Sequence, residues 1–358
     1  MCKFIPAPLL PALLVLLIGT SGHAEKQAYE ITNLGAFTDD ALYSMGLSIN
    51  NAGQVSGFSG NGVGVYHAYR YDPHGHLPGL TDLGPSYGEG INDLGQEVIT
   101  GDKVFRSSGN GENFIFTDLG ISGIGSSFRD GIGGDGHWSI NNGGQVTGST
   151  GFGPPPASGP SHAFRSSRNG LPVFLTDLGT IGGSYSFGYG INSLGQVTGS
   201  STVSGDLVSH AFRSSANGEP LGLTDLGTLG GDTSLGFAIN DRGQVTGRAN
   251  LPGGSINHAF RSSANGEKVF LEDLGTLQGY DLSTGFGINN QGTVVGRSCA
   301  NNGVCHAFLY DGSMHDLNDF LPPGSGWELI KANGINESGQ ITGMGIIRGV
   351  ERPFLLSH

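Results

Sequence analysis

The chain has 358 residues, 66 of them glycine, and a formal net charge of −13. So acidic a chain repels phosphate backbones, which excludes a general role in binding nucleic acid. Glycine at more than twice its usual share of ~7% can indicate disorder. Here, however, the glycines recur at fixed positions among aromatic and β-branched residues, so we expect many turns in an ordered fold.

Residues 1–24 have the pattern of a secretory signal peptide. Lys3 precedes an apolar stretch from Leu9 to Ile18, and Gly22 and Ala24 place small residues at the −3 and −1 positions of a cleavage site. The stretch is too short for a membrane anchor, and no second run of spanning length follows. We therefore expect a chain of residues 25–358 without a membrane span, secreted by the general export pathway to the periplasm or the outside of the cell.

Three short phrases recur seven times, which indicates a repeat of about 48 residues. Ile-Asn-x-x-Gly-Gln-Val or a close variant is anchored at Asn50, Asn92, Asn141, Asn192, Asn240, Asn289 and Asn336. His-Ala-Phe or His-Ala-Tyr starts at His67, His162, His210, His258 and His306, with Lys103-Val104-Phe105 and Arg352-Pro353-Phe354 in the two other units. Asp-Leu-Gly starts at Asp82, Asp118, Asp177, Asp225 and Asp273, with Asn33-Leu34-Gly35 and Asp316-Leu317-Asn318 at the ends.

Each unit contains four short β-type runs bounded by Gly, Asn and Asp, and glycine interrupts every helical period. Four strands in a unit of this length are typical of a propeller blade. A β-helix coil is the weaker alternative, because it is usually shorter and lacks antiparallel hairpins. We predict an all-β, seven-bladed β-propeller as a single domain over residues 25–358. Its ring should close by pairing of Tyr29–Leu34 with Pro353–Leu356.

The phrases INxxGQVTG, HAFR and DLGTLGG resemble the HAF-repeat family of predicted bacterial extracellular proteins, and the resemblance covers nearly all of residues 25–358. It implies export and a repeat architecture. It implies no catalytic residue, because the family supplies no established activity. Members often end in a sorting tail with an apolar helix and a basic stop, which is not seen here.

In five consecutive units an Asp stands 15 residues after the first residue of the His-Ala-Phe phrase or its variant, and that first residue is His in four of the units and Lys103 in the second. Asn217-Gly218 predicts a two-residue type I′ turn, which would place His210 directly opposite Asp225. The same arithmetic gives the pairs His67–Asp82, Lys103–Asp118, His162–Asp177 and His258–Asp273. In the sixth unit, Asp311-Gly312 would place His306 opposite Leu317 instead of Asp316, so a bulge or another partner is expected there.

We interpret these pairs as structural. A catalytic dyad would need one positioned nucleophile and not five copies, whereas a pair that satisfies a polar group is needed once in each blade. Histidines that line a channel and bind metal are the other alternative, but cross-strand pairing would occupy them within their own blades. We therefore predict no catalytic residue, no metal site and no cofactor.

Cys299 and Cys305 flank an Asn-Asn-Gly turn. In an exported protein this arrangement predicts a local disulfide. A pair of free thiols or half of a metal site is the alternative, and no further cysteine follows the signal peptide to complete a zinc ligand set.

Connections of variable length share one face of the predicted disc, and variable loops on a rigid scaffold commonly carry binding sites. Aromatic and acidic residues of these connections could stack on sugar rings or hold a peptide, although any one of them could instead cover the end of its own blade. The candidate ligand-binding residues are Phe128, Asp130, Asp135, Trp138, Phe152, Asp319 and Trp327.

The sequence thus favours an exported, non-catalytic binding module, expected to be a monomer, whose partner is an extracellular glycan, peptide or protein. The alternative is an extracellular propeller enzyme of the glycoside hydrolase or polysaccharide lyase type, acting through acids such as Asp130, Asp135 or Asp319. Glycoside hydrolysis would require two carboxylates ~5–10 Å apart. A purely structural surface-layer role also fits the acidic charge.

Overall fold

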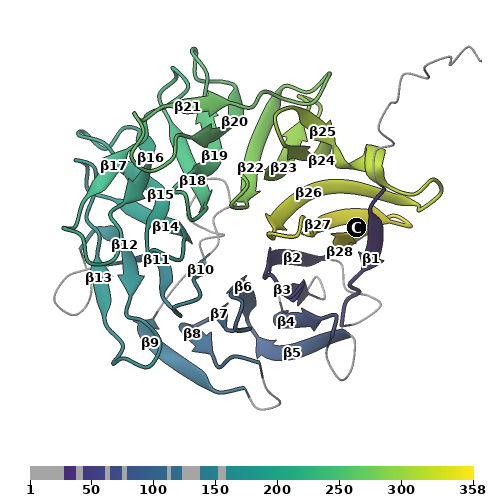
Figure 1. Cartoon of the computed structure of the whole chain (residues 1–358), viewed down its shortest axis with the longest axis horizontal. Coiled ribbons are helices and arrows are strands. Elements are labelled where there is room, and N and C mark those ends of the chain that lie inside the picture. The colour runs from purple at the N-terminus through teal and green to yellow at the C-terminus, as the bar shows by residue number, and fades with distance from the viewer. Residues whose placement is uncertain are drawn as a thin grey trace, which may run out of the picture.

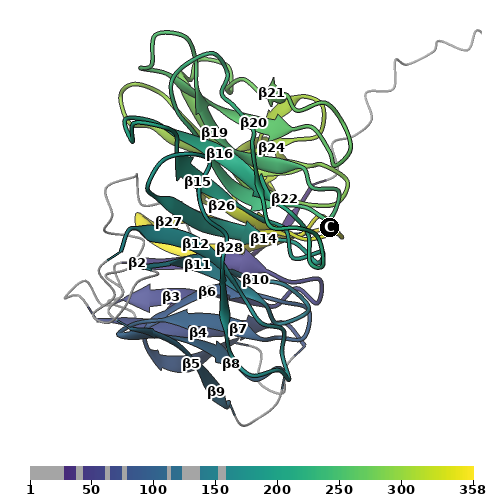
Figure 2. The same cartoon turned by 90° about the vertical axis from the view of Figure 1, so that its left-hand side faces the viewer.

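The structure, a computed structural model, describes residues 28–37, 43–60, 65–74, 79–110, 114–122, 138–151 and 159–358. These residues form seven four-stranded antiparallel sheets arranged as blades around a central channel (Figure 1). Figure 2 shows the ring from the side, with β18–β25 above and β2–β9 below. The predicted seven-bladed β-propeller is confirmed. The predicted signal peptide lies outside the described residues.

In each of the first six blades the first strand lines the channel, and the strands follow one another outward in chain order. The first three blades are β2 (Tyr43–Ile49), β3 (Val55–Gly60), β4 (Tyr66–Asp72) and β5 (Gly79–Pro85); β6 (Tyr87–Ile91), β7 (Glu97–Thr100), β8 (Lys103–Ser107) and β9 (Phe116–Ser122); β10 (Ser139–Ile140), β11 (Val146–Gly151), β12 (Ser161–Ser166) and β13 (Leu175–Asp177). The next three are β14 (Ser186–Ile191), β15 (Val197–Thr202), β16 (Ser209–Ser214) and β17 (Leu223–Asp225); β18 (Ser234–Ile239), β19 (Val245–Asn250), β20 (Asn257–Ser262) and β21 (Leu271–Asp273); β22 (Leu282–Ile288), β23 (Val294–Cys299), β24 (Cys305–Tyr310) and β25 (Met314–Asp316).

The seventh blade joins the two ends of the ring. It contains β26 (Trp327–Ile335), β27 (Ile341–Ile347), β28 (Val350–Ser357) and, outermost, β1 (Glu30–Asn33), and a short 3-10 helix, η1 (Leu317–Phe320), precedes it. In the β1–β28 ladder Glu30 lies opposite Ser357 and Asn33 opposite Phe354. The predicted closure through the terminal strands is therefore confirmed, and it leaves no blade with a missing strand.

The repeated apolar residues fill the blades. In the fourth blade Val197 and Phe212 are fully buried and pack with Ile191 and Leu178. The aromatic residue of the His-Ala-Phe phrase is fully buried in six units, as Tyr69, Phe164, Phe212, Phe260, Phe308 and Phe354. Truncating such a side chain to Ala costs about 3–5 kcal/mol, so this one position anchors six of the seven blades.

Hydrogen bonds of the asparagine in the Ile-Asn-x-x-Gly-Gln phrase join each blade to the next. In Asn192, Oδ1 accepts from the N–H of Gln196 at 2.9 Å, while Nδ2 donates to Gln196 Oε1 and to the carbonyl of Asn240, both at 3.0 Å. Gly195 takes φ +77°, which the turn requires and glycine adopts freely. The Nδ2-to-carbonyl bond recurs from Asn50 to Asn92, Asn141, Asn192, Asn240, Asn289, Asn336 and back to Asn50, a closed set that we call the asparagine ring.

The predicted two-residue turns are wrong. Between β16 and β17 the connection spans residues 215–222, and Asn217 lacks the positive φ that a type I′ turn requires at both central positions. Its side chain instead exchanges two hydrogen bonds, of 2.8 and 3.2 Å, with Gln145 of the preceding blade. Asp225 therefore lies opposite Phe212, two residues away from the predicted position opposite His210.

The same two-residue correction applies to the other predicted hairpins, and the sixth unit follows the same register as its neighbours. The observed opposite pairs are Tyr69–Asp82, Phe105–Asp118, Phe164–Asp177, Phe260–Asp273 and Phe308–Asp316. The predicted disulfide is confirmed: Cys299 and Cys305 lie opposite each other on β23 and β24 and are joined. Across the described ranges, no helix is long and apolar enough to cross a membrane.

One ion pair is buried between the first two blades. Two residues after its turn glycine the second unit has Glu97, where the other units have Val or Ile. This side chain is fully buried beside Arg70, whose Nε donates to Glu97 Oε1 at 2.5 Å. Burial raises the pKa of Glu97 to about 7, although the charge and hydrogen bond of Arg70 act in the opposite direction.

We expect Asn192→Ala to lower the free energy of unfolding by about 3 kcal/mol, because it removes three buried hydrogen bonds at about 1 kcal/mol each. Chemical denaturation of the mature chain measures this value. Asn302→Ala is the control, because Asn302 is exposed and accepts one hydrogen bond, from the N–H of Val304. Equal midpoints for the two variants would contradict an energetic role of the asparagine ring.

A second prediction concerns pH. A carboxyl group whose pKa is raised in the folded state stabilises the fold below its unfolded pKa of about 4.5, and this contribution is lost as pH rises through about 7. The stability of the wild type relative to Glu97→Gln should therefore fall between these pH values, by at most roughly 3 kcal/mol. Denaturation of both proteins from pH 4.5 to 8 tests this, and a constant difference would mean that Glu97 stays ionised beside Arg70.

Candidate functional site

The structure brings each predicted His or Lys into contact with its Asp, although from a diagonal position in the ladder. His210 Nδ1 lies 2.9 Å from Asp225 Oδ2, and Lys103 Nζ lies 2.5 Å from Asp118 Oδ2. His306 also reaches Asp316, with Nδ1 2.6 Å from Oδ2, so the expectation that the sixth unit would differ is wrong. The remaining contacts, of 2.9–3.0 Å, are His67–Asp82, His162–Asp177 and His258–Asp273.

The aspartate of each pair also closes a turn. Asp225 Oδ1 accepts from the N–H of Gly227 at 2.8 Å, an Asx-type turn in which Gly227 has φ +74°. In the seventh blade, where Arg352 stands in the place of the histidine, Asn33 Oδ1 accepts the same bond from the N–H of Gly35 at 2.9 Å. In Asp118 the hydrogen bonds from Lys103 and the N–H of Gly120 hold the pKa of the carboxyl below its ordinary value. Each of these carboxylates therefore makes two structural contacts, one with the His or Lys and one with a backbone N–H of the turn.

The residues predicted on the variable-loop face do not form one described site. Trp138 is only 3% exposed and packs edge-to-face on Phe164 in the third blade, so it is a core residue that also borders the channel. Asp319 is exposed in η1, and Trp327, at the start of β26, is half-buried against Phe354. Phe128, Asp130, Asp135 and Phe152 lie outside the described residues.

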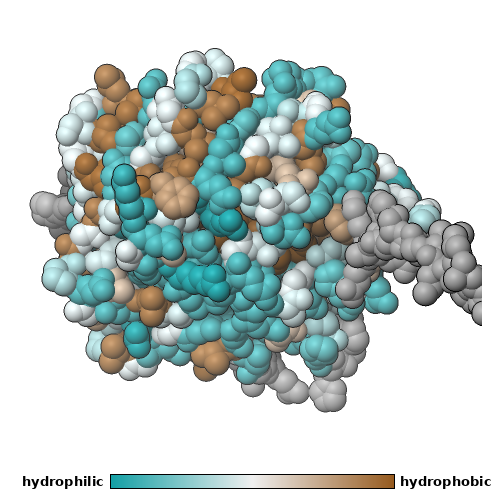
Figure 3. All heavy atoms as spheres, turned by 45° about the horizontal axis from the view of Figure 1, so that its top comes forward, coloured by the Kyte–Doolittle hydropathy of each residue, from teal (hydrophilic) through white to brown (hydrophobic). Residues whose placement is uncertain are grey.

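The outer surface carries single exposed apolar side chains. Phe174 and Phe270 directly precede the outermost strands of the third and fifth blades, Leu221 lies two residues before that of the fourth, and all three are more than half exposed. In Figure 3 apolar residues gather toward the upper part of the surface but are separated by hydrophilic residues. Isolated exposed apolar residues are usual on proteins and mark no site by themselves.

The central channel is where the seven units differ most. In six of the seven blades the innermost strand has a register shift next to a glycine, and a residue left unpaired there borders the channel, as a β-bulge re-aims a side chain. In the third blade Trp138, just before β10, takes this place. We call the seven residues the chamber ring: Leu47, Glu89, Trp138, Tyr189, Phe237, Phe286 and Asn333.

Glycines on the neighbouring strand permit this close approach. A Cβ at Gly199 would overlap the carbonyl oxygen of Phe187, and one at Gly247 would overlap that of Leu235. These glycines belong to the Val-Thr-Gly phrase that follows the asparagine turn. The phrase therefore gives the bulged innermost strand room to present the chamber-ring residue.

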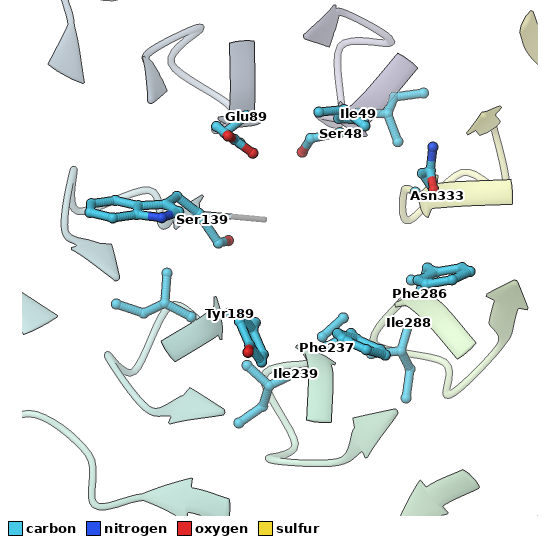
Figure 4. Close-up of a pocket in the computed structure, with 18 of the residues that line it drawn as sticks. Ser48, Ile49, Glu89, Ser139, Tyr189, Phe237, Ile239, Phe286, Ile288 and Asn333 are labelled. Carbon is cyan, nitrogen blue, oxygen red and sulfur yellow. The ribbon is translucent and has the colours of Figure 1, made fainter. Parts of the chain in front are cut away.

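The chamber ring encloses a cavity of about 160 Å³. Tyr189, Phe237 and Phe286 form an aromatic arc, with neighbouring ring centroids 5.7 and 5.6 Å apart, and Trp138 continues the lining in the third blade. Figure 4 shows Glu89 across the cavity from Tyr189 and Phe237, with Asn333 beside Phe286. One side of the chamber is thus aromatic and the other polar.

The polar groups of the chamber are buried. Glu89 is 2% exposed, and its Oε1 accepts from Thr100 Oγ1 at 2.8 Å. Asn333 Nδ2 donates to the carbonyl of Gly46 at 2.8 Å, but its Oδ1 has no hydrogen-bond partner among the described residues. Lys331 Nζ lies 4.0 Å from the centroid of Phe286, which places a cation against that ring.

A second, polar cavity of about 170 Å³ opens where the asparagine turns meet the channel. Seven isoleucines, one before each asparagine, line this second cavity, and five of them also line the chamber. The residues after the asparagines form a rim in which side chains bond to neighbouring turns; Asp241 Oδ1, for instance, accepts from the N–H of Ser193 at 2.9 Å. Within the described ranges no three His, Cys, Asp or Glu residues are grouped to hold a metal ion.

Sequence reasoning missed the chamber, although a signal was present. Three residues before each repeated asparagine, between small residues in most units, the chain has an aromatic residue in four units and Leu, Glu or Asn in the other three. The seven residues there are those of the chamber ring. A variable position inside the most regular phrase of a repeat indicates a place that the scaffold does not fix, and it could have been read as a binding position.

No protein family model and no curated protein matches this chain. Among solved structures it is similar to "Crystal structure of TolB from Acinetobacter baumannii", with 12% sequence identity and a TM-score of 0.47 over 85% of this chain. The chain spans 64% of the length of that chain.

The His–Asp pairs generate a stability prediction. His210→Lys, which copies the Lys103–Asp118 pair, should be tolerated within about 0.5 kcal/mol, and His210→Ala should cost somewhat more, because partly exposed pairs are worth about 0.2–1 kcal/mol. Asp225→Asn should keep the turn to Gly227, as Asn33 does, whereas Asp225→Ala should cost about 1–2 kcal/mol. Thermal unfolding of the four variants gives the ranking. A variant that kept its melting temperature and lost ligand binding would contradict the structural assignment.

Proposed function

We propose that this protein is an exported, non-catalytic binding module of the HAF-repeat type, and that it holds its ligand in the central channel of the propeller. The observation that carries the proposal is the chamber ring. The scaffold repeats one set of turns and interblade bonds, and it presents seven side chains, four of them aromatic and the others Leu47, Glu89 and Asn333, to one central cavity. Enclosed cavities with apolar walls and a few placed polar groups are the usual form of small-ligand sites.

The rest of the described chain supports a scaffold role. The repeated Asp residues are engaged twice, by a His or Lys and by a turn N–H, so their arrangement is that of turn stabilisers. The Cys299–Cys305 disulfide and the signal-peptide pattern of residues 1–24 support export to an oxidising compartment.

The test is a binding screen of the mature chain on arrays of glycans, peptides and small metabolites, followed by hydrolysis and lyase assays on every hit. Each hit is compared among the wild type, Tyr189→Ala and Phe270→Ala. We expect to find ligands whose affinity falls about tenfold in Tyr189→Ala, because contact between a ligand and one aromatic ring contributes binding free energy of about that size. Phe270→Ala, an aromatic truncation at an exposed outer hairpin, should bind as the wild type does.

Two results would contradict the proposal. Ligands whose affinity is unchanged in Tyr189→Ala would place binding outside the channel. Turnover of a bound polymer would show that the protein is an enzyme.

A further inference from the structure

One buried acceptor in the wall of the chamber has no donor. Asn333 is 6% exposed and lines the cavity, and its Oδ1 has no hydrogen-bond partner among the described residues. Its Nδ2 donates to the carbonyl of Gly46 at 2.8 Å, so turning the amide over would lose that bond and bring two oxygens together. Oδ1 is therefore held as an unpaired acceptor. Buried acceptors of this kind are rare in proteins and call for a donor.

Three features fix the position of this acceptor. In the β26–β27 ladder a register shift between Ala332 and Gly334 leaves Asn333 out of the pairing. The side chain is tied to the first blade at Gly46, and Figure 4 shows it beside Phe286 of the sixth blade. The acceptor is thus in place before a ligand arrives, and such preorganisation lowers the free-energy cost of binding.

The chamber walls on both sides of Asn333 are apolar. Phe286 and Phe237 are each 7% exposed, and their ring centroids lie 5.6 Å apart. Leu47 borders the cavity in the first blade. A ligand that moves from water to such walls loses hydration, which is costly for an ion and much less costly for a neutral hydroxyl group that finds an acceptor. An uncharged ligand therefore suits this part of the chamber.

The size of the cavity limits the ligand to about one ring. A cavity of about 150 Å³ holds a molecule the size of benzene, and the chamber measures about 160 Å³. A sugar chain or a folded partner cannot be accommodated there. A single sugar fits the apolar walls poorly, because each of its hydroxyl groups without a partner would cost free energy.

From this geometry we propose that the chamber binds a small uncharged alcohol, whose hydroxyl donates to Asn333 Oδ1 while its apolar body lies against Phe237 and Phe286. The inference rests on the proposed function and assigns the ligand chemistry of that same site. A hydroxyl suits the acceptor better than an amide does, because an amide brings a carbonyl that needs a donor of its own. Glu89 already has partners, Thr100 among them, so Asn333 sets the requirement for a donor.

Cyclohexanol and cyclohexanone test this assignment, because they match in size and only the alcohol can donate a hydrogen bond. Isothermal titration calorimetry of the mature chain measures both affinities. We expect saturable binding of cyclohexanol with half-saturation at about 1 mM, and binding of cyclohexanone weaker by about tenfold or more. Cyclohexylammonium, the charged match, should also bind about tenfold more weakly than the alcohol.

Asn333→Leu separates recognition from structure. The substitution removes the acceptor and also the bond to Gly46, so a merely structural role would weaken the alcohol and the ketone alike. A role in recognition predicts that only the alcohol loses about tenfold in affinity, which abolishes its preference over the ketone. Asn250→Leu is the matched control, because Asn250 Nδ2 donates to the carbonyl of Gly254 at 3.0 Å and does not line the chamber. It should keep the wild-type preference.

The wild type alone decides the assignment should Asn333→Leu fail to fold. Equal affinity for cyclohexanol and cyclohexanone overturns it, as does tighter binding of cyclohexylammonium or of methyl β-glucopyranoside. Absence of saturable binding overturns it as well, and would mean that water completes Asn333. In each of these cases the binding function of the channel stands or falls separately, on whether ligands from the screen lose affinity in Tyr189→Ala.

Discussion

The hydrogen bond from one asparagine side chain to the next blade's turn is the interaction on which this propeller depends. Neighbouring blades share apolar clusters, such as that of Leu178 with Ile191 and Phe212, but apolar packing is non-directional and does not by itself fix the angle between two sheets. The asparagine does so, because its Oδ1 shapes its own turn while Nδ2 reaches the carbonyl of the next asparagine. Seven such bonds return to Asn50, so the distance between neighbouring blades is set at the inner edge of the ring.

The neighbouring parts of the repeat reinforce the same joint. Arg165 Nη1 donates to the carbonyl of Gly195 at 2.6 Å, and Arg213 does the same for Gly243, so the arginine after His-Ala-Phe also binds the next blade's turn. Asn217 reaches back to Gln145 of the blade before. Three phrases that are far apart in the sequence therefore meet at each interblade contact, which explains why they recur together.

Counting phrases was sufficient to predict the ring and its closure, because these depend on which segments exist and how many. The disulfide was predicted separately, from the two cysteines that flank a turn. The register of the outer hairpin was not predictable in the same way. The Asn-Gly at 217–218 has the composition of a tight turn, but Asn217 is taken up by a partner in another blade, and a longer connection forms. Local turn preference was overruled by a contact that no single hairpin contains.

The chamber was missed for a related physical reason. A bulge places a residue according to the pairing of two strands, and the alternation of side chains along one strand gives no sign of it. Phe237 and Tyr189 read in the sequence as ordinary strand aromatics of a blade core. Only the register shifts beside Gly236 and Gly188 turn them toward the axis.

The same shifts explain how a sevenfold scaffold can hold an unsymmetrical ligand. If every unit carried one residue at the bulge, the channel would offer seven identical contacts and could not orient anything that enters it. Here the third to sixth blades contribute aromatic rings, and the second and seventh contribute Glu89 and Asn333. The asparagine ring does not depend on these side chains, because its bonds run between backbone carbonyls and the asparagines themselves. The channel can therefore vary in chemistry without weakening the joints between blades, and the binding function proposed above would use this separation of stability from recognition to place one specific site in a repeated sequence.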